Sequence, residues 1–150
     1  MSTTTHAKAL FNKCPLSISP RLQTVLIDHI NTNATDSSTA ITLNFRDTSY
    51  SAEAGGFHPV EIAMQKDSAQ RWSILYITDF AYFGLAYPEL ERNVDFDIDI
   101  DIGNNMAFFT GVGWQAIDAY GVNDFYQLWE SNFLSYLEMD AFDEIKLSSH

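Results

Sequence analysis

An uninterrupted alternation of apolar and acidic residues runs from Val94 to Ile102. Side chains of a β-strand point to opposite faces in turn, so the alternation predicts a strand with one apolar face and one acidic face. The acidic positions are Asp95, Asp97, Asp99 and Asp101. A strand that is buried on one face only is typical of an antiparallel sheet with one solvated side. This segment therefore indicates such a sheet.

Four aspartates on one strand face are unusual, because Asp is depleted in strands. Neighbouring carboxylates on that face lie ~7 Å apart, and each pair repels by roughly 0.6 kcal/mol in water before salt screening. Repulsion of this size is tolerable on a solvated face and prohibitive on a dry one. We therefore expect these four residues, called here the acidic strip, to face solvent or a cationic partner.

The partner strand sets the neighbours of the acidic strip. Gly103–Asn105 is a turn signal, and the apolar segment Met106–Val112 follows it. A loop made of Gly103–Asn105 pairs Ile102 with Met106. The apolar residues of both strands then lie on the same face of the sheet. In that register the residues opposite Asp101, Asp99, Asp97 and Asp95 are Ala107, Phe109, Gly111 and Gly113. No Lys or Arg neutralises the strip, so we expect it to be accessible.

The acidic strip allows two interpretations, and a third is rejected. It can be a solvated strand face whose charge also prevents edge-to-edge aggregation. It can instead be a docking surface for a basic partner. A calcium loop of the EF-hand type is rejected, because Ile102 stands where the loop needs Gly and Phe108 stands where it needs a bidentate Glu.

Two helices are predicted outside this region. Ser19 and Pro20 form a helix start, with Ser as N-cap and Pro at the first helical position, and Asn31–Asn33 ends that helix. Its apolar stripe is Leu22, Val25, Leu26, His29 and Ile30. A second helix begins with Asn123 as its cap. Its predicted stripe is Phe125, Leu128, Trp129, Phe133, Tyr136 and Leu137.

Further strands are predicted between the helices. Ala40–Phe45 and Val60–Met64 alternate in polarity. Trp72–Phe83 carries large apolar residues on both faces, which predicts a central strand covered by helices. The order of elements predicts one α+β domain over residues 1–150, in which about five or more strands form an antiparallel meander and the helices are segregated from the sheet. Residues 1–18 are expected to be loosely ordered.

Composition excludes several classes of protein. The chain has 20 acidic and 8 basic residues, a formal net charge of -12, and one cysteine. This balance argues against a nucleic-acid or anionic-membrane binder, since phosphate contact needs positive charge. Twelve acidic and two basic residues follow residue 90, so a surface that works through charge is expected there. A single Cys excludes a disulfide framework. No signal sequence or spanning segment is visible, so we expect a cytoplasmic protein.

Signals for an enzyme are weak. His58 and Glu61 lie three positions apart on a predicted strand, hence on opposite faces, which is wrong for a shared metal site. No nucleophile–base pair is visible. We therefore predict no catalytic residue, no metal and no cofactor. An enzyme that uses Asp79, Glu61 and His58 in a pocket is kept only as the weakest hypothesis.

Four segments carry a resemblance to a known family: Ala52–Ile62, Tyr76–Phe80, Tyr87–Leu90 and Leu128–Phe133. From about residue 20 onward the chain resembles an uncharacterised bacterial family, the domain of unknown function 2787, which often occurs on pathogenicity islands. That family is similar to the acidic mitochondrial matrix glycoproteins, which bind the globular heads of complement. The resemblance implies a twisted antiparallel sheet of about seven strands between N-terminal and C-terminal helices. It also implies a homo-oligomer, and it assigns no catalytic residue.

The sequence therefore favours a non-enzymatic acidic module that docks basic protein surfaces through Asp95, Asp97, Asp99 and Asp101. The alternative is a DNA mimic that blocks a nucleic-acid-binding protein, since the carboxylate spacing loosely matches the phosphates of one DNA strand.

Overall fold

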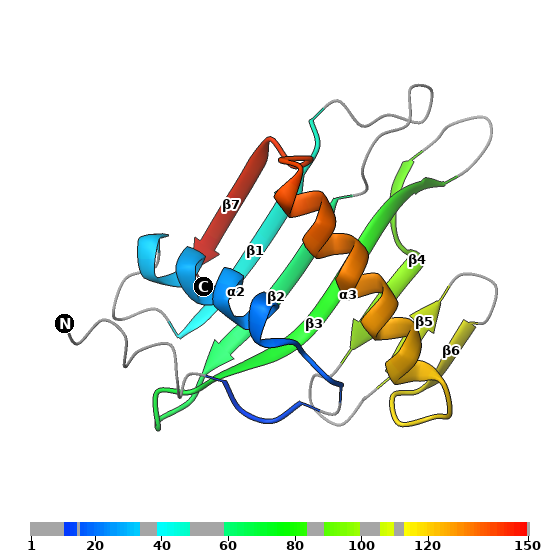
Figure 1. Ribbon diagram of the computed structural model, residues 1–150, viewed down its shortest axis with the longest axis horizontal. Coiled ribbons are helices and arrows are strands. Elements are labelled where there is room, and N and C mark those ends of the chain that lie inside the picture. The colour runs from blue at the N-terminus through cyan, green and yellow to red at the C-terminus, as the bar shows by residue number, and fades with distance from the viewer. Residues whose placement is uncertain are drawn as a thin grey trace.

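The computed structural model of the chain combines one layer of sheet with one layer of helix (Figure 1). The described residues are 11–14, 16–33, 39–48, 59–83, 89–99, 106–109 and 113–149. The helices are α2 (Pro20–Asn33) and α3 (Val122–Glu138). The strands are β1 (Ala40–Arg46), β2 (Val60–Lys66), β3 (Trp72–Phe83), β4 (Glu89–Asp99), β5 (Met106–Phe109), β6 (Gly113–Ala116) and β7 (Glu144–Ser149).

The described strands form a 7-stranded antiparallel sheet in the order β6-β5-β4-β3-β2-β1-β7. Strands β1 to β6 are a meander, in which each strand pairs with the next one along the chain. After α3 the chain returns to the far side of β1 and adds β7 as an edge strand. The α+β class, the meander and the central place of Trp72–Phe83 are confirmed. The predicted order ended on a helix, and neither β6 nor β7 was predicted.

Helix α2 begins where its sequence predicts. The Ser19 hydroxyl accepts a hydrogen bond from the backbone N–H of Leu22 at 3.1 Å, and Pro20 is the first helical residue. This is N-capping by Ser, with a Pro whose missing N–H costs nothing at this position. Leu22, Leu26 and Ile30 of the predicted stripe are buried, Val25 and His29 are half-buried, and Ile27, which was not predicted, is buried as well.

The first two strands bury alternate residues, as their polarity predicts. Ile41, Leu43 and Phe45 of β1 are buried, and the register places them opposite Met64, Ile62 and Val60 of β2. Directly opposite residues of an antiparallel pair share a face of the sheet. These three pairs therefore form the middle of the hydrophobic core.

Helix α3 differs from its prediction at its start. Its N-cap is Gly121 with φ 86°, and no side chain caps it. A left-handed φ suits Gly, which has no Cβ to clash. The prediction that Asn123 is the cap is therefore wrong. The Asn123 side chain instead accepts from the Ser17 backbone N–H at 2.9 Å and donates to the Ser17 hydroxyl at 3.0 Å, so it ties α3 to the segment before α2.

The buried stripe of α3 also differs from its prediction. The buried residues are Val122, Tyr126, Glu130, Phe133 and Leu134. Phe125 and Leu128, which were predicted to be buried, are 48% and 61% exposed. The stripe is rotated because the buried positions Tyr126, Glu130 and Leu134 follow each other at intervals of four residues, and one of them is a carboxylate that an apolar pattern passes over.

Candidate binding face of the sheet

Both helices pack against the same face of the sheet. The Phe45 ring contacts the His29 ring of α2 at a centroid distance of 5.9 Å and the Phe133 ring of α3 at 5.1 Å. In Figure 1 the two helices accordingly lie on one side of the strands. The prediction that Trp72–Phe83 is covered by helices therefore holds for one face of β3 only. No described helix covers the opposite face, called here the open face.

The open face carries a hollow of about 610 Å³ over β7, β1, β2 and β3. Its lining is polar throughout: Thr42, Asn44, Arg46, Glu61, Tyr76, Glu144, Lys146 and Ser148. These side chains belong to alternate positions of their strands, so they share the face opposite to the core. The hollow can make hydrogen bonds and ion pairs, and it offers little apolar surface.

A half-buried carboxylate, Glu61, organises the middle of the hollow. Its Oε1 accepts from Asn44 Nδ2 at 3.3 Å, and its Oε2 accepts from the Tyr76 hydroxyl. The Arg46 Nε in turn donates to Asn44 Oδ1 at 2.7 Å. Each side chain in this chain of hydrogen bonds fixes the next one, so the polar surface is preorganised without a ligand.

Strand β4 extends the open face beyond β3. The register places Asp97 opposite Thr78 of β3, and Asp99 opposite Tyr76 of β3. Asp95 falls in the stretch of β4 where the pairing with β3 is irregular, and Asp101 lies outside the described residues. Among the described residues of the acidic strip, Asp97 and Asp99 are therefore the two whose pairing with β3 is regular.

The predicted pairing of β4 with β5 is wrong by three residues. Ile98 pairs with Ala107 and Phe96 with Phe109, whereas a loop of Gly103–Asn105 alone would pair Ile98 with Thr110. Residues 100–105 lie outside the described residues, and Asp99 and Met106 are the described pair nearest to them. An odd shift exchanges the two faces of the partner strand.

The shift changes the neighbours of the acidic strip. Asp97 lies opposite Phe108 and Asp99 opposite Met106, where the prediction had Gly111 and Phe109. On the other face, Ala107 is fully buried, as its pairing with Ile98 requires. The residues in register with Asp97 and Asp99 on both sides are thus Thr78, Tyr76, Phe108 and Met106, and none of them is basic.

The two carboxylates proposed for an enzyme lie on opposite sides of the sheet. Asp79 pairs with the core residue Val60, and Glu61 pairs with Thr78. Asp79 Oδ2 accepts from the Trp129 Nε1–H of α3 at 3.1 Å, on the helical side. His58 lies outside the described residues. Asp79 and Glu61 therefore cannot act on one substrate.

A buried carboxylate on α3 was missed by the sequence analysis. Glu130 is 5% exposed, and its Oε2 accepts from the Tyr126 hydroxyl at 2.5 Å and from the backbone N–H of Ser19 at 3.1 Å. Burial, and next the hydrogen bond to Glu130, raise the pKa of Tyr126. The spacing of four residues between Tyr126, Glu130 and Leu134 is the signal that could have placed Glu130 inside.

Within the described ranges, no three His, Cys, Asp or Glu side chains are grouped so that they could hold a metal ion. Neither α2 nor α3 is long and apolar enough to cross a membrane.

These features define a class of protein: an α+β fold with two helices on one face of an antiparallel sheet and a polar surface on the other. The sequence profile of the family described as "protein of unknown function (DUF2787)" matches residues 20–148, and the chain belongs to this family. No protein of curated function matches the chain.

Two solved structures from Vibrio cholerae are similar to the chain. A hypothetical protein from the VSP-II pathogenicity island is 41% identical, with a TM-score of 0.81 over 93% of this chain and 99% of its own. A conserved hypothetical protein from pathogenicity island VPI-2 is 43% identical, with a TM-score of 0.81 over 93% of this chain and 100% of its own. The second is described as sharing structural homology with human P32, a mitochondrial matrix glycoprotein. The predicted resemblance is confirmed.

Proposed function

We propose that the chain is a non-enzymatic protein-binding module that docks basic partners on the open face, with the acidic strip at the centre of the contact. The observation that carries the proposal is the register of β4, in which Asp97 and Asp99 have no basic residue opposite them on either side. The formal net charge of -12 adds long-range attraction for a cationic partner.

Aromatic residues on both sides of β4 favour arginine in the partner. Tyr76 is in register with Asp99, and Phe108 is in register with Asp97. The next position in that line is Trp114, which is 45% exposed, and its ring lies 5.4 Å from that of Phe108. A guanidinium group can pair with a carboxylate and stack on an aromatic ring, which an ammonium group does less well.

The other end of the open face carries charges of both signs. Arg46 and Lys146 are exposed and line the hollow on β1 and β7, together with Glu144, which is in register with Arg46. A partner that contacts this end as well as β4 therefore needs groups that complement both signs, which restricts its orientation.

A pair of variants with equal charge tests the proposal. One variant changes all four residues of the acidic strip to Asn. The control changes four exposed aspartates elsewhere to Asn: Asp28, Asp118, Asp124 and Asp140. Both variants reduce the negative charge by four. A surface charge pair contributes about 0.4 kcal/mol, so the loss of four such pairs predicts that the strip variant binds a labelled oligoarginine peptide about 15-fold more weakly by fluorescence anisotropy.

The control separates a local surface from overall charge. We expect the control variant to keep most of the affinity of the wild type, and oligoarginine to bind more tightly than oligolysine of the same length. Equal weakening of both variants would contradict the proposal, since it would show that net charge alone attracts the peptide. Proteins captured from a lysate by the wild type and lost with the strip variant then identify partners, and release by duplex DNA would point to the DNA-mimic alternative instead.

The proposal includes association of copies of the chain, in line with the likeness of the fold to that of P32. Sedimentation equilibrium should give a mass that is a multiple of the 17.0 kDa of one chain. A mass of one chain at all concentrations would remove this part of the proposal and leave the docking surface untouched.

A further inference from the structure

The segment before α2 lies beside the start of β3, which begins at Trp72. Phe11 forms a parallel bridge with Trp72, and the Asn12 N–H donates to the Trp72 carbonyl at 2.9 Å. From there the segment leads to α2, which begins at Pro20.

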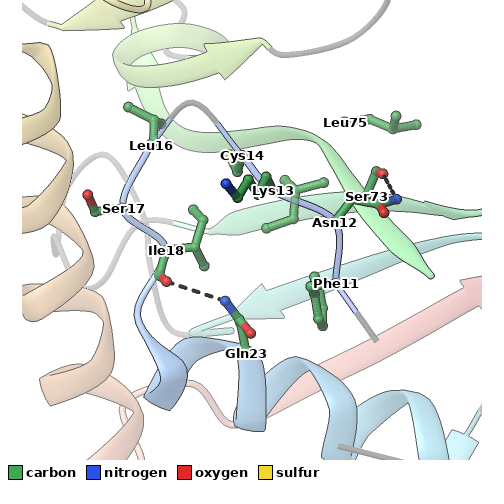
Figure 2. A pocket seen from close by; sticks show the side chains of 11 residues that line it. Phe11, Asn12, Lys13, Cys14, Leu16, Ser17, Ile18, Gln23, Ser73 and Leu75 are labelled. Carbon is green, nitrogen blue, oxygen red and sulfur yellow. Dashed lines mark hydrogen bonds between the residues drawn. The ribbon is translucent and has the colours of Figure 1, made fainter. Parts of the chain in front are cut away.

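A cavity of about 470 Å³ lies between this segment, β3 and the start of α2 (Figure 2). Hydrogen bonds hold the segment on both sides of it. Asn12 Nδ2 donates to the Ser73 hydroxyl at 2.8 Å, and Gln23 Nε2 donates to the Ile18 carbonyl at 3.4 Å. Leu75 contributes to the lining from the β-bulge, where β3 has one residue more than β2 between paired positions. These hydrogen bonds and the β-bulge shape the cavity, and its volume is in the range of small-molecule sites.

The lining of the cavity is mixed, because apolar side chains share it with those of Asn12, Ser17, Gln23 and Ser73. Its apolar side chains are Phe11, Leu16, Ile18, Ile74 and Leu75. Cys14 is half-buried there, and burial raises the pKa of its thiol, so the group is neutral at pH 7. Lys13 is exposed and is the charged residue of the described lining. A site that carries one cation and no described carboxylate stands out in a chain with 20 acidic residues.

We propose that this cavity binds a linear amphiphile with an apolar chain and one terminal carboxylate, of the class of medium-chain fatty acids. The chain lies against the apolar wall, and the carboxylate pairs with the Lys13 ammonium at the rim. Lys13 takes part in no salt bridge with another described residue, so a ligand would have none to break there.

The proposal predicts two independent trends in affinity. Each CH₂ added to the ligand should tighten binding about fourfold until the cavity is full. A carboxylic acid should bind several-fold more tightly than the alcohol of the same length, because only the acid pairs with Lys13. An apolar groove without a specific head-group contact would show the first trend and not the second.

Cys14 provides the readout, since it is the one cysteine of the chain and lines the cavity. The probe ligands are decanoate, its shorter and longer homologues, and decanol, all below their micelle concentrations. We measure the rate at which a thiol reagent modifies Cys14 in the full chain, with glutathione as a control for effects on the reagent. We expect decanoate to slow the modification severalfold and saturably, with one ligand per chain by calorimetry.

Two variants and one control test the site. Lys13→Gln should reduce the affinity for decanoate to that for decanol, and Leu75→Trp should fill the cavity and abolish protection. Leu128→Trp, on the exposed side of α3, should behave as the wild type. Absence of protection in the wild type, equal affinity for decanoate and decanol, or protection that survives both variants would overturn the proposal. The comparison of acid with alcohol needs only the wild type, so the test holds even where a variant does not fold.

Discussion

Removal of one buried hydroxyl from α3 provides a quantitative test of the packing. Glu130 Oε2 accepts from Tyr126 at 2.5 Å and from the Ser19 backbone N–H at 3.1 Å, and Tyr126 is fully buried. Tyr126→Phe leaves the buried carboxylate with one donor fewer. A hydrogen bond to a charged group contributes about 1.5–3 kcal/mol. We therefore expect Tyr126→Phe to lower the free energy of unfolding by about 2 kcal/mol, and the melting temperature by about 4–8 °C.

Urea denaturation measures this loss, with an unchanged m-value as the sign that only stability has changed. Glu130→Gln and the double variant complete a double-mutant cycle, and we expect a coupling energy of about 1 kcal/mol because the two groups share a hydrogen bond. A loss below about 0.5 kcal/mol for Tyr126→Phe, or additive effects of the two substitutions, would refute the importance of this contact.

Alkaline pH gives a second readout of the same residue. Burial raises the pKa of Tyr126, with the hydrogen bond to Glu130 as the next cause, whereas an unfolded tyrosine titrates near pH 10. Above about pH 10 the unfolded chain releases this proton and the folded chain keeps it, so the stability contributed by Tyr126 is lost as pH rises. Tyr126→Phe should therefore lose stability less steeply above pH 10 than the wild type, and parallel curves would contradict the assignment.

Three further predictions concern α2 and α3. Burial lowers the pKa of His29, and the charge of Asp28 opposes this effect. As pH falls below about 6.5, the unfolded chain therefore binds the His29 proton before the folded chain does, and the folded state loses stability. The His29→Phe variant should lose less stability than the wild type on acidification, as measured by urea titrations. Gly121 has φ 86°, and a Cβ added there would meet no heavy atom within 4 Å, so Gly121→Ala should cost about 1 kcal/mol through the backbone alone, and Gly121→Asn should cost less. Phe125→Ser with Leu128→Ser should change unfolding free energy by at most about 0.5 kcal/mol, because both side chains are exposed; a large loss would show that they are buried.

The elements that the sequence predicted well are those whose signals are local. The Ser19-Pro20 start specifies α2 because a cap acts on the next few residues. The alternation within Ala40–Phe45 specifies β1 because one face of the strand is buried. The strands that were missed carry little burial: β7 is exposed at most positions, and an edge strand with polar residues gains its structure from pairing with β1, which no local pattern records.

The candidate binding face depends on information that the sequence does not carry locally. Alternation identified Asp97 and Asp99, but their neighbours follow from pairing with β3 and β5. The turn signal in Gly103–Asn105 did not fix the register between the two strands. The predicted register was wrong by three residues, so it placed Gly111 opposite Asp97, where the structure has Phe108. The aromatic surroundings that now favour arginine in the partner could therefore not be predicted from the chain alone.

The two strands that pair with β1 are synthesised at very different times. Strand β2 follows it closely along the chain, whereas β7 is made about a hundred residues later, and such distant pairings form slowly. Until β7 pairs with β1, that side of β1 presents unpaired N–H and C=O groups to its surroundings. Two nascent chains on one messenger RNA can pair through these edges and misassemble. Pairing of Glu144–Ser149 with β1 covers these backbone groups. Strand β7 is mostly exposed and adds little to the core, and yet its pairing is the step that protects a newly made chain from edge-to-edge association.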